Sequence, residues 1–278
     1  MNSMTAYERG QLAQIHAWQA ESPGWGTRLL ARPSASAAQM VQAIVPVSAL
    51  RTVFKKFDQT AAKLSGASAI LRRAGVESLE GLRAETLQSC DRLSKFEART
   101  AMSFAGATGA ALGVAGAAGM VVDIPALITQ AFRVIHRTGL CYGEDLVTAS
   151  HQGMAIGVFA LTSANTMDEK QAALKALANH GELLDAAWRD GVERAAEREL
   201  AKEAAMFSLQ TLASRIGVHL SKRKAAGVVP VIGAVIGGAV NAWYIHEVAQ
   251  AARFVFTERW LRAKYPDRRS NMLPAPAN

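Results

Sequence analysis

Two long stretches without a charged residue constrain this chain more than any other feature. Residues 100–122 run for 23 positions, and residues 225–245 for 21 positions, without Asp, Glu, Lys or Arg. At about 1.5 Å per helical residue, either stretch has the length to cross the roughly 30 Å hydrocarbon core of a bilayer. The first stretch contains eight alanines and five glycines, which makes it only marginally hydrophobic for insertion. Two interpretations follow: central helices buried against each other in a bundle, or a hairpin that enters one leaflet.

The glycines of these stretches favour close contact between helices. Gly106, Gly109, Gly113 and Gly116 fall along one face of a helix, and a second small-residue pair lies at Gly233-x-x-x-Gly237. Faces of this kind let two helix backbones approach closely, in lipid or in a protein interior. We therefore expect both stretches to be helices that pack through their small residues.

The rest of the chain predicts amphipathic helices. Apolar residues recur at spacings of three and four, as in Leu50, Val53, Phe54 and Phe57, whereas period-two alternation is nearly absent. This pattern predicts an all-α fold: a single multi-helix domain in which two central Gly/Ala-rich helices are wrapped by amphipathic helices. The expected boundaries are an N-terminal segment over residues 1–35, a helical domain over residues 36–265 and a flexible tail over residues 266–278.

The charge balance favours an anionic partner, because the chain carries a formal net charge of +8. Its basic residues bracket the second uncharged stretch, an arrangement that a membrane surface selects, whereas nucleic acid needs a basic stripe with base-reading side chains. No secretory signal is visible at the N-terminus, so we expect the protein on the cytoplasmic side of the inner membrane. Anionic lipid is the expected partner and nucleic acid is not. The candidate membrane contacts are Lys222, Arg223, Lys224, Trp243, Tyr244, Trp260 and Arg262.

Sequence motifs for chemistry are missing. Cys90 and Cys141 are the two cysteines, which is typical of a reducing compartment. The six histidines include no H-x-x-x-H pair, and the glycine-rich stretch lacks the strand and lysine of a phosphate-binding loop. The sequence therefore predicts no catalytic residue, no metal ligand and no cofactor.

Three polar residues form a candidate ligand site between the central helices, namely Asp123, Tyr142 and Asn241. Asp123 and Asn241 each end a glycine-rich run and precede an apolar segment, so they could occupy related central positions. A buried carboxylate is costly unless it is paired. The alternative is that Asp123, followed by Ile-Pro125, is the N-cap of a helix, and we favour this cap for Asp123.

The order of several motifs resembles the EcsC protein family. These motifs are Asp123-Ile-Pro125, Tyr142-Gly143-Glu-Asp145, the segment from Ser78 to Asp91, and Pro230-Val-Ile-Gly233-Ala-Val-Ile-Gly237 through Asn241 to Trp260. The resemblance runs from about Leu12 to Tyr265 and is most specific in the C-terminal block. It implies a bacterial, helical, membrane-associated protein linked to an ABC-type transporter or another membrane protein, and it supplies no catalytic residues. The chain has no P-loop motif, so it would be an accessory of a transporter and not its motor.

We therefore expect a non-enzymatic helical protein that associates peripherally with the cytoplasmic membrane, as an accessory to a transport or secretion system. A different class remains open, in which the central helices enclose a ligand or active site built from Asp123, Tyr142 and Asn241. A third alternative is a soluble protein-interaction module. Burial of the glycine-rich helices would favour the pocket, and an exposed apolar surface would favour the membrane.

Overall fold

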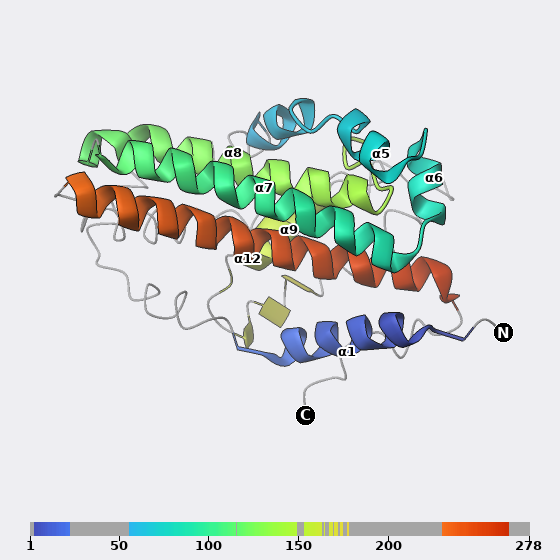
Figure 1. Ribbon diagram of the computed structural model, residues 1–278. Helices are drawn as coiled ribbons and strands as arrows, with labels where there is room; N and C mark the ends of the chain where they lie inside the picture. The colour runs from blue at the N-terminus through green and yellow to red at the C-terminus, as the bar shows by residue number, and fades with distance from the viewer. Residues whose placement is uncertain are drawn as a thin grey trace, which may run out of the picture.

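The computed structural model describes residues 3–22, 56–114, 116–148, 153–162 and 230–266, together with Ala164 and several positions between 167 and 177. The labelled helices, shown in Figure 1, are α1 (Ala6–Ala20), α5 (Ser68–Ala74), α6 (Leu79–Ala84), α7 (Leu87–Val114), α8 (Gly116–Cys141), α9 (Met154–Thr162) and α12 (Pro230–Lys264). Residues 56–63 are also helical, and the described residues include no strand. The predicted all-α fold is confirmed.

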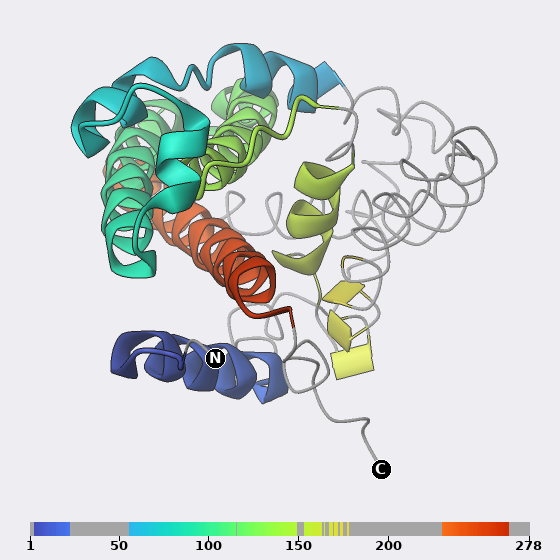
Figure 2. The same cartoon turned by 90° about the vertical axis from the view of Figure 1, so that its right-hand side faces the viewer.

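Helices α7, α8 and α12 lie side by side and are the longest of the described helices (Figure 1). Helix α8 runs back along α7, and α12 runs antiparallel to α7. Seen along these three helices, α1 lies on one side of α12, and α5 and α6 lie on the other side of the molecule (Figure 2). Two long uncharged segments, in α7 and in α12, therefore become neighbours although more than 100 residues separate them in sequence.

The contact between α7 and α12 depends on glycine. A Cβ atom placed on Gly238 would lie 2.9 Å from the backbone oxygen of Gly106 and 3.2 Å from the Cβ of Ala110. The first of these distances is too short for two non-bonded atoms, and the obstacle is a helix backbone that cannot turn away. A Cβ on Gly106 would meet Ala242 at an ordinary 3.5 Å. Of these two glycines, Gly238 is thus the one that leaves no room for a Cβ atom between the two helix backbones.

The apolar core is centred on the aromatic residues of α8, α9 and α12. The rings of Phe132 and Phe159 stack with their centroids 4.7 Å apart, and Phe256 is fully buried beside Tyr142. Burying a side chain of this size contributes about 1.5–3 kcal/mol relative to leaving it in water. The stack of Phe132 and Phe159 ties α9 to α8, and Phe256 of α12 packs beside Tyr142 at the end of α8.

A left-handed glycine ends the turn after α8. Gly143 has φ of +75°, and a Cβ on it would lie 2.4 Å from Cγ of Arg83 and 2.6 Å from the backbone oxygen of Leu79. Arg83 also donates from Nε to the backbone oxygen of Gly143 at 2.9 Å. Only glycine combines this backbone conformation with this close approach, so Gly143 fixes how α6 packs against the end of α8.

The N-cap interpretation of Asp123 is wrong. Asp123 lies inside α8, which begins at Gly116 and continues through Pro125 to Cys141. A proline inside a helix removes one backbone hydrogen bond and costs about 3 kcal/mol. The apolar residues that follow, among them Leu127 and Phe132, are buried, and their burial offsets that cost. Packing of the second half of α8 therefore outweighs the local preference for a break.

Candidate functional site

The central polar cluster of the molecule forms around Asp91 of α7. Tyr142, at the end of α8, is 2% exposed, and its hydroxyl donates to Oδ1 of Asp91 at 2.5 Å. The same hydroxyl lies 3.0 Å from the hydroxyl of Thr257 on α12. Tyr7 of α1 donates to the other carboxylate oxygen, also at 2.5 Å. One buried carboxylate thus joins four elements, α1, α7, the end of α8 and α12.

The charge of Asp91 is compensated from α12. Nη1 of Arg253 lies 3.6 Å from Oδ2 of Asp91 and donates to Oε1 of Gln11 on α1 at 2.9 Å. An isolated buried carboxylate would be strongly unfavourable, but a carboxylate with a cation and two hydroxyl donors is satisfied. The cluster is therefore complete with the side chains that the protein itself supplies.

The two tyrosines of this cluster keep their protons. Burial raises the pKa of Tyr142, and the adjacent Asp91 carboxylate raises it further. Burial and the hydrogen bond to Asp91 likewise raise the pKa of Tyr7. Both phenols are therefore protonated at neutral pH and donate to the Asp91 carboxylate. The cluster joins α1, α7, α12 and the end of α8 through these hydrogen bonds.

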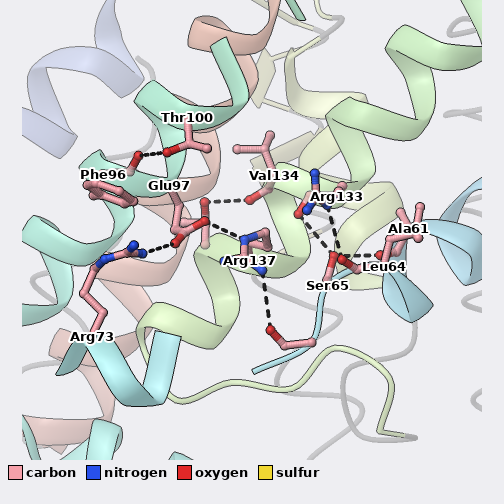
Figure 3. Close-up of polar contacts among 12 residues, drawn as sticks. Ala61, Leu64, Ser65, Arg73, Phe96, Glu97, Thr100, Arg133, Val134 and Arg137 are labelled. Atoms are coloured by element: carbon pink, nitrogen blue, oxygen red, sulfur yellow. Dashed lines mark hydrogen bonds and ion pairs between the residues drawn. The ribbon is translucent and has the colours of Figure 1, made fainter. Parts of the chain in front are cut away.

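A second buried carboxylate, Glu97 of α7, lies between two arginines (Figure 3). Nη1 of Arg73 lies 3.1 Å from Oε1, and Nε of Arg137 lies 2.5 Å from Oε2. Arg137 and Arg133 of α8 also donate to the backbone oxygens of residues 66 and 64, at 3.4 and 3.3 Å. This cluster links α5 and the turn before it to α7 and α8.

The structure does not bring Tyr142 together with the other two candidate ligand residues. Asn241 is buried on α12, 16 positions before Thr257, which corresponds to roughly 24 Å along a helix. Asp123 is 19 positions before Tyr142, or roughly 28 Å along α8. Tyr142 therefore belongs to the Asp91 cluster, whereas Asp123 and Asn241 lie in the uncharged halves of their helices.

The candidate membrane contacts fall into three groups. Lys222, Arg223 and Lys224 lie outside the described residues. Trp243 and Tyr244 are half-buried on α12, and Trp260 is buried with 9% exposure. Arg262 pairs with Glu258 of its own helix at 2.5 Å.

The other described cations near the end of α12 are also paired. Arg259 lies 2.9 Å from Glu144, and Lys264 lies 2.7 Å from Glu8. These basic residues of α12 thus each contact a carboxylate of the protein itself.

The opposite end of the molecule is an uncharged arm. We use this name for residues 100–114 of α7, 116–132 of α8 and 230–245 of α12, whose helices extend beyond the other labelled helices in Figure 1. Asp123 is the only Asp, Glu, Lys or Arg in these three segments. Threonine hydroxyls in the arm donate to the backbone oxygen four positions earlier, from Thr100, Thr108 and Thr129 at 3.1, 3.1 and 2.8 Å. These hydroxyl protons are satisfied without water.

The family assignment follows from a match over nearly the whole chain, since residues 9–261 match the EcsC protein family. The chain belongs to the EcsC protein family. No curated protein and no solved structure shows a significant match to it. Within this EcsC chain, the matched region begins inside α1 and ends inside α12, so it contains the arm and all of the Asp91 cluster except Tyr7.

Sequence reasoning missed the polar contacts that tie α1 of this EcsC domain to α12. A local signal was present, because Thr5-x-x-Glu8 is a capping box, and both of its hydrogen bonds are formed. The same Glu8 carboxylate accepts hydrogen bonds from Lys264 at 2.7 Å and Tyr265 at 2.8 Å. The cap could have been predicted from the sequence. The partners from the far end of the chain could not.

Two further properties bear on the function of this EcsC domain. None of the helices that the structure describes combines the length and hydropathy needed to span a bilayer. Within the same residues, no three His, Cys, Asp or Glu side chains are grouped so that they could hold a metal ion.

Proposed function

We propose that this EcsC family member associates peripherally with the cytoplasmic membrane by placing its uncharged arm in one leaflet, and that its role is non-enzymatic. The observation that carries the proposal is the juxtaposition of the two uncharged sequence stretches. They meet at Gly106 and Gly238 and together give three adjacent helices with a single carboxylate among them. An accessory role beside a transport or secretion system is a further part of the proposal and rests on the family resemblance.

The dimensions of the arm support partial insertion. Residues 100–114 of α7 correspond to about 22 Å of helix, which exceeds one leaflet but falls short of the roughly 30 Å hydrocarbon core. Backbone groups within helices are satisfied internally, which the interior of a bilayer requires. The threonine hydroxyls of the arm meet the same requirement through their bonds to the helix backbone.

The surface of the arm also supports the proposal. Phe104 is 50% exposed on α7, Ala107 and Ala111 of the same helix are exposed, and so is Ala239 of α12. An exposed large aromatic side chain surrounded by small apolar residues is favourable at a lipid interface and has no role in the core. The alternative of a ligand pocket loses support, because Tyr142 is fully engaged with Asp91 and lies far from Asn241.

The test is flotation of the full-length protein with vesicles made of phosphatidylcholine and phosphatidylglycerol. We expect the wild-type protein to float with the vesicles, and we expect Phe104→Glu to weaken this binding about tenfold or more, because a charge in the interface is costly. Leu64→Glu is the matched control, since Leu64 is 54% exposed but lies outside the arm. Failure of the wild-type protein to float would overturn membrane association. Equal binding by Phe104→Glu and Leu64→Glu would show that the arm is not inserted.

A further inference from the structure

The outward face of α7 forms a continuous stripe with two chemically different halves. Its exposed residues recur at spacings of three and four along the helix, namely Arg92, Lys95, Phe96, Arg99, Thr100, Ser103, Phe104, Ala107 and Ala111. The half that precedes the arm is basic, and the half within the arm is uncharged. We call this set the α7 stripe.

The α7 stripe contains no carboxylate. The only acidic residues of α7 are Asp91 and Glu97, and both are buried. Asp91 is engaged with Tyr7, Tyr142 and Arg253, and Glu97 is engaged with Arg73 and Arg137. The negative charges of the helix are therefore turned inward and neutralised, while its positive charges face outward.

The three cations of the stripe differ from six other described cations, which are paired with carboxylates. Among the described residues, Arg92, Lys95 and Arg99 take part in no ion pair, whereas Arg73, Arg137, Arg253, Arg259, Arg262 and Lys264 each contact a carboxylate. A row of exposed, uncompensated cations raises the local concentration of anions. Folding alone gives no reason for such a row beside a helix that has buried its own acids.

Aromatic side chains accompany these cations. Phe96 is 42% exposed, and the guanidinium of Arg73 lies 3.7 Å from its ring centroid. Figure 3 shows Phe96 and Arg73 at the edge of the Glu97 cluster. Phe104 follows two helical turns later, at roughly 12 Å along the axis. Basic and aromatic residues on one helix face are the composition that binds an interface with anionic lipid.

We propose that the α7 stripe is the surface that lies against the membrane, with Arg92, Lys95 and Arg99 contacting anionic lipid headgroups and Phe104 at the acyl-chain boundary. This inference rests on the proposed membrane association and adds the contacting face and the residues that meet the lipid headgroups. The basic half of the stripe sets the level of the headgroups, and the uncharged half continues from there into the arm. Binding has an electrostatic component that added salt weakens.

The test compares two sets of charge reversals in the full-length protein. The stripe variant carries Arg92→Glu, Lys95→Glu and Arg99→Glu. The control variant carries Arg9→Glu, Lys56→Glu and Lys63→Glu, which reverse three exposed cations outside the stripe and change the net charge by the same amount. Flotation uses vesicles of phosphatidylcholine alone and vesicles of phosphatidylcholine and phosphatidylglycerol in equal amounts, at low and high salt.

We expect the stripe variant to bind the anionic vesicles roughly 100-fold more weakly than the wild-type protein, and the control variant to bind within a few fold of it. An equal loss of vesicle binding in both variants would overturn the inference, because it would show that binding depends on the net charge of the protein and not on the α7 stripe. If the stripe variant bound as tightly as the wild-type protein, the inference about the α7 stripe would also be overturned, but membrane association would remain intact. Failure of the wild-type protein to bind either vesicle would overturn both proposals. If the reversals prevent folding, Arg92→Gln, Lys95→Gln and Arg99→Gln serve instead, with an expected loss of about tenfold.

Discussion

The two ends of the three long helices are held together by opposite means. At the end near α1, the helices are joined by buried carboxylates, with Asp91 and Glu97 each contacting side chains from several elements. In the arm, α7 and α12 pack closely because Gly238 has no side chain and lies against the backbone of Gly106. Polar clusters specify which helices meet, because each donor must find its acceptor. Contacts between small residues set only the distance between the helices. They leave an uncharged surface, which we propose enters lipid.

The largest expected effect comes from removing the carboxylate at the first of these ends. Asp91→Ala leaves Tyr7 and Tyr142 without their acceptor and Arg253 without its counter-charge, so we expect a loss of about 3–5 kcal/mol in the free energy of unfolding. Asp91→Asn keeps an acceptor oxygen and should cost less. Chemical denaturation of both variants measures the difference. An Asp91→Ala protein as stable as the wild-type protein would show that the carboxylate does not hold this end together.

Overpacking the arm should have the next largest effect. Gly238→Leu places side-chain atoms where the backbone of α7 lies, and we expect a loss of about 1–3 kcal/mol. Gly106→Ala is the control, because its Cβ would meet neighbours at 3.5 Å, so the usual gain in helix propensity, up to about 1 kcal/mol, offsets any crowding. Thermal unfolding distinguishes the two. Identical melting temperatures would mean that α7 and α12 are not in close contact.

The contact between α1 and α12 should depend on pH. Burial alone would raise the pKa of Glu8, but hydrogen bonds from Lys264, the Thr5 backbone and Tyr265 outweigh burial and lower it. A folded-state pKa below the unfolded value gives stability that is present above about pH 4.5 and is lost as the pH falls through the folded-state pKa. We expect Glu8→Gln to cost about 1 kcal/mol at neutral pH.

The measurement for Glu8 is a series of denaturation curves from pH 7 down to acid conditions. The gap between wild type and Glu8→Gln should narrow as the pH falls, because protonation removes the same charge that the substitution removes. A constant gap would assign the effect to packing rather than to the carboxylate.

We expect the smallest effect in the rate at which the two cysteines are labelled. This rate also reports most directly whether the two ends open separately. Burial and the neighbouring Asp91 carboxylate raise the pKa of Cys90 to about 12, and burial raises the pKa of Cys141. Both thiols should therefore be unreactive in the folded protein near pH 8. We expect Asp91→Asn to accelerate their labelling and Gly238→Ala to leave it unchanged. Acceleration by both variants would mean that the ends open together.

The helical class and the uncharged stretches could be predicted from the sequence, because spacing and composition are local properties. The polar clusters could not, since Asp91 meets Tyr7, Tyr142 and Thr257 across separations of 84, 51 and 166 residues. No pattern in a single sequence links such distant residues. For Asp123 the reverse is true. The local sequence Asp-Ile-Pro predicted a helix N-cap, but the packing of α8 keeps the helix continuous through this position. Tyr142 is buried, but its hydroxyl contacts Asp91 and not Asn241, with which the sequence analysis grouped it.

The contact between Glu8 and Lys264 also has a consequence for biosynthesis. These residues are 256 positions apart, so α1 leaves the ribosome long before its partner Lys264 is made. At about 5–20 residues per second, α1 waits roughly 10–50 s before its partners on α12 exist. Of the fully buried residues of α1, which are Glu8, Gln11, Ile15 and Gln19, only one is apolar, although Tyr7, Leu12 and Trp18 also pack partly buried against the core. During that interval the mixed polar and apolar face of α1 exposes less apolar surface to water than a fully apolar docking face would.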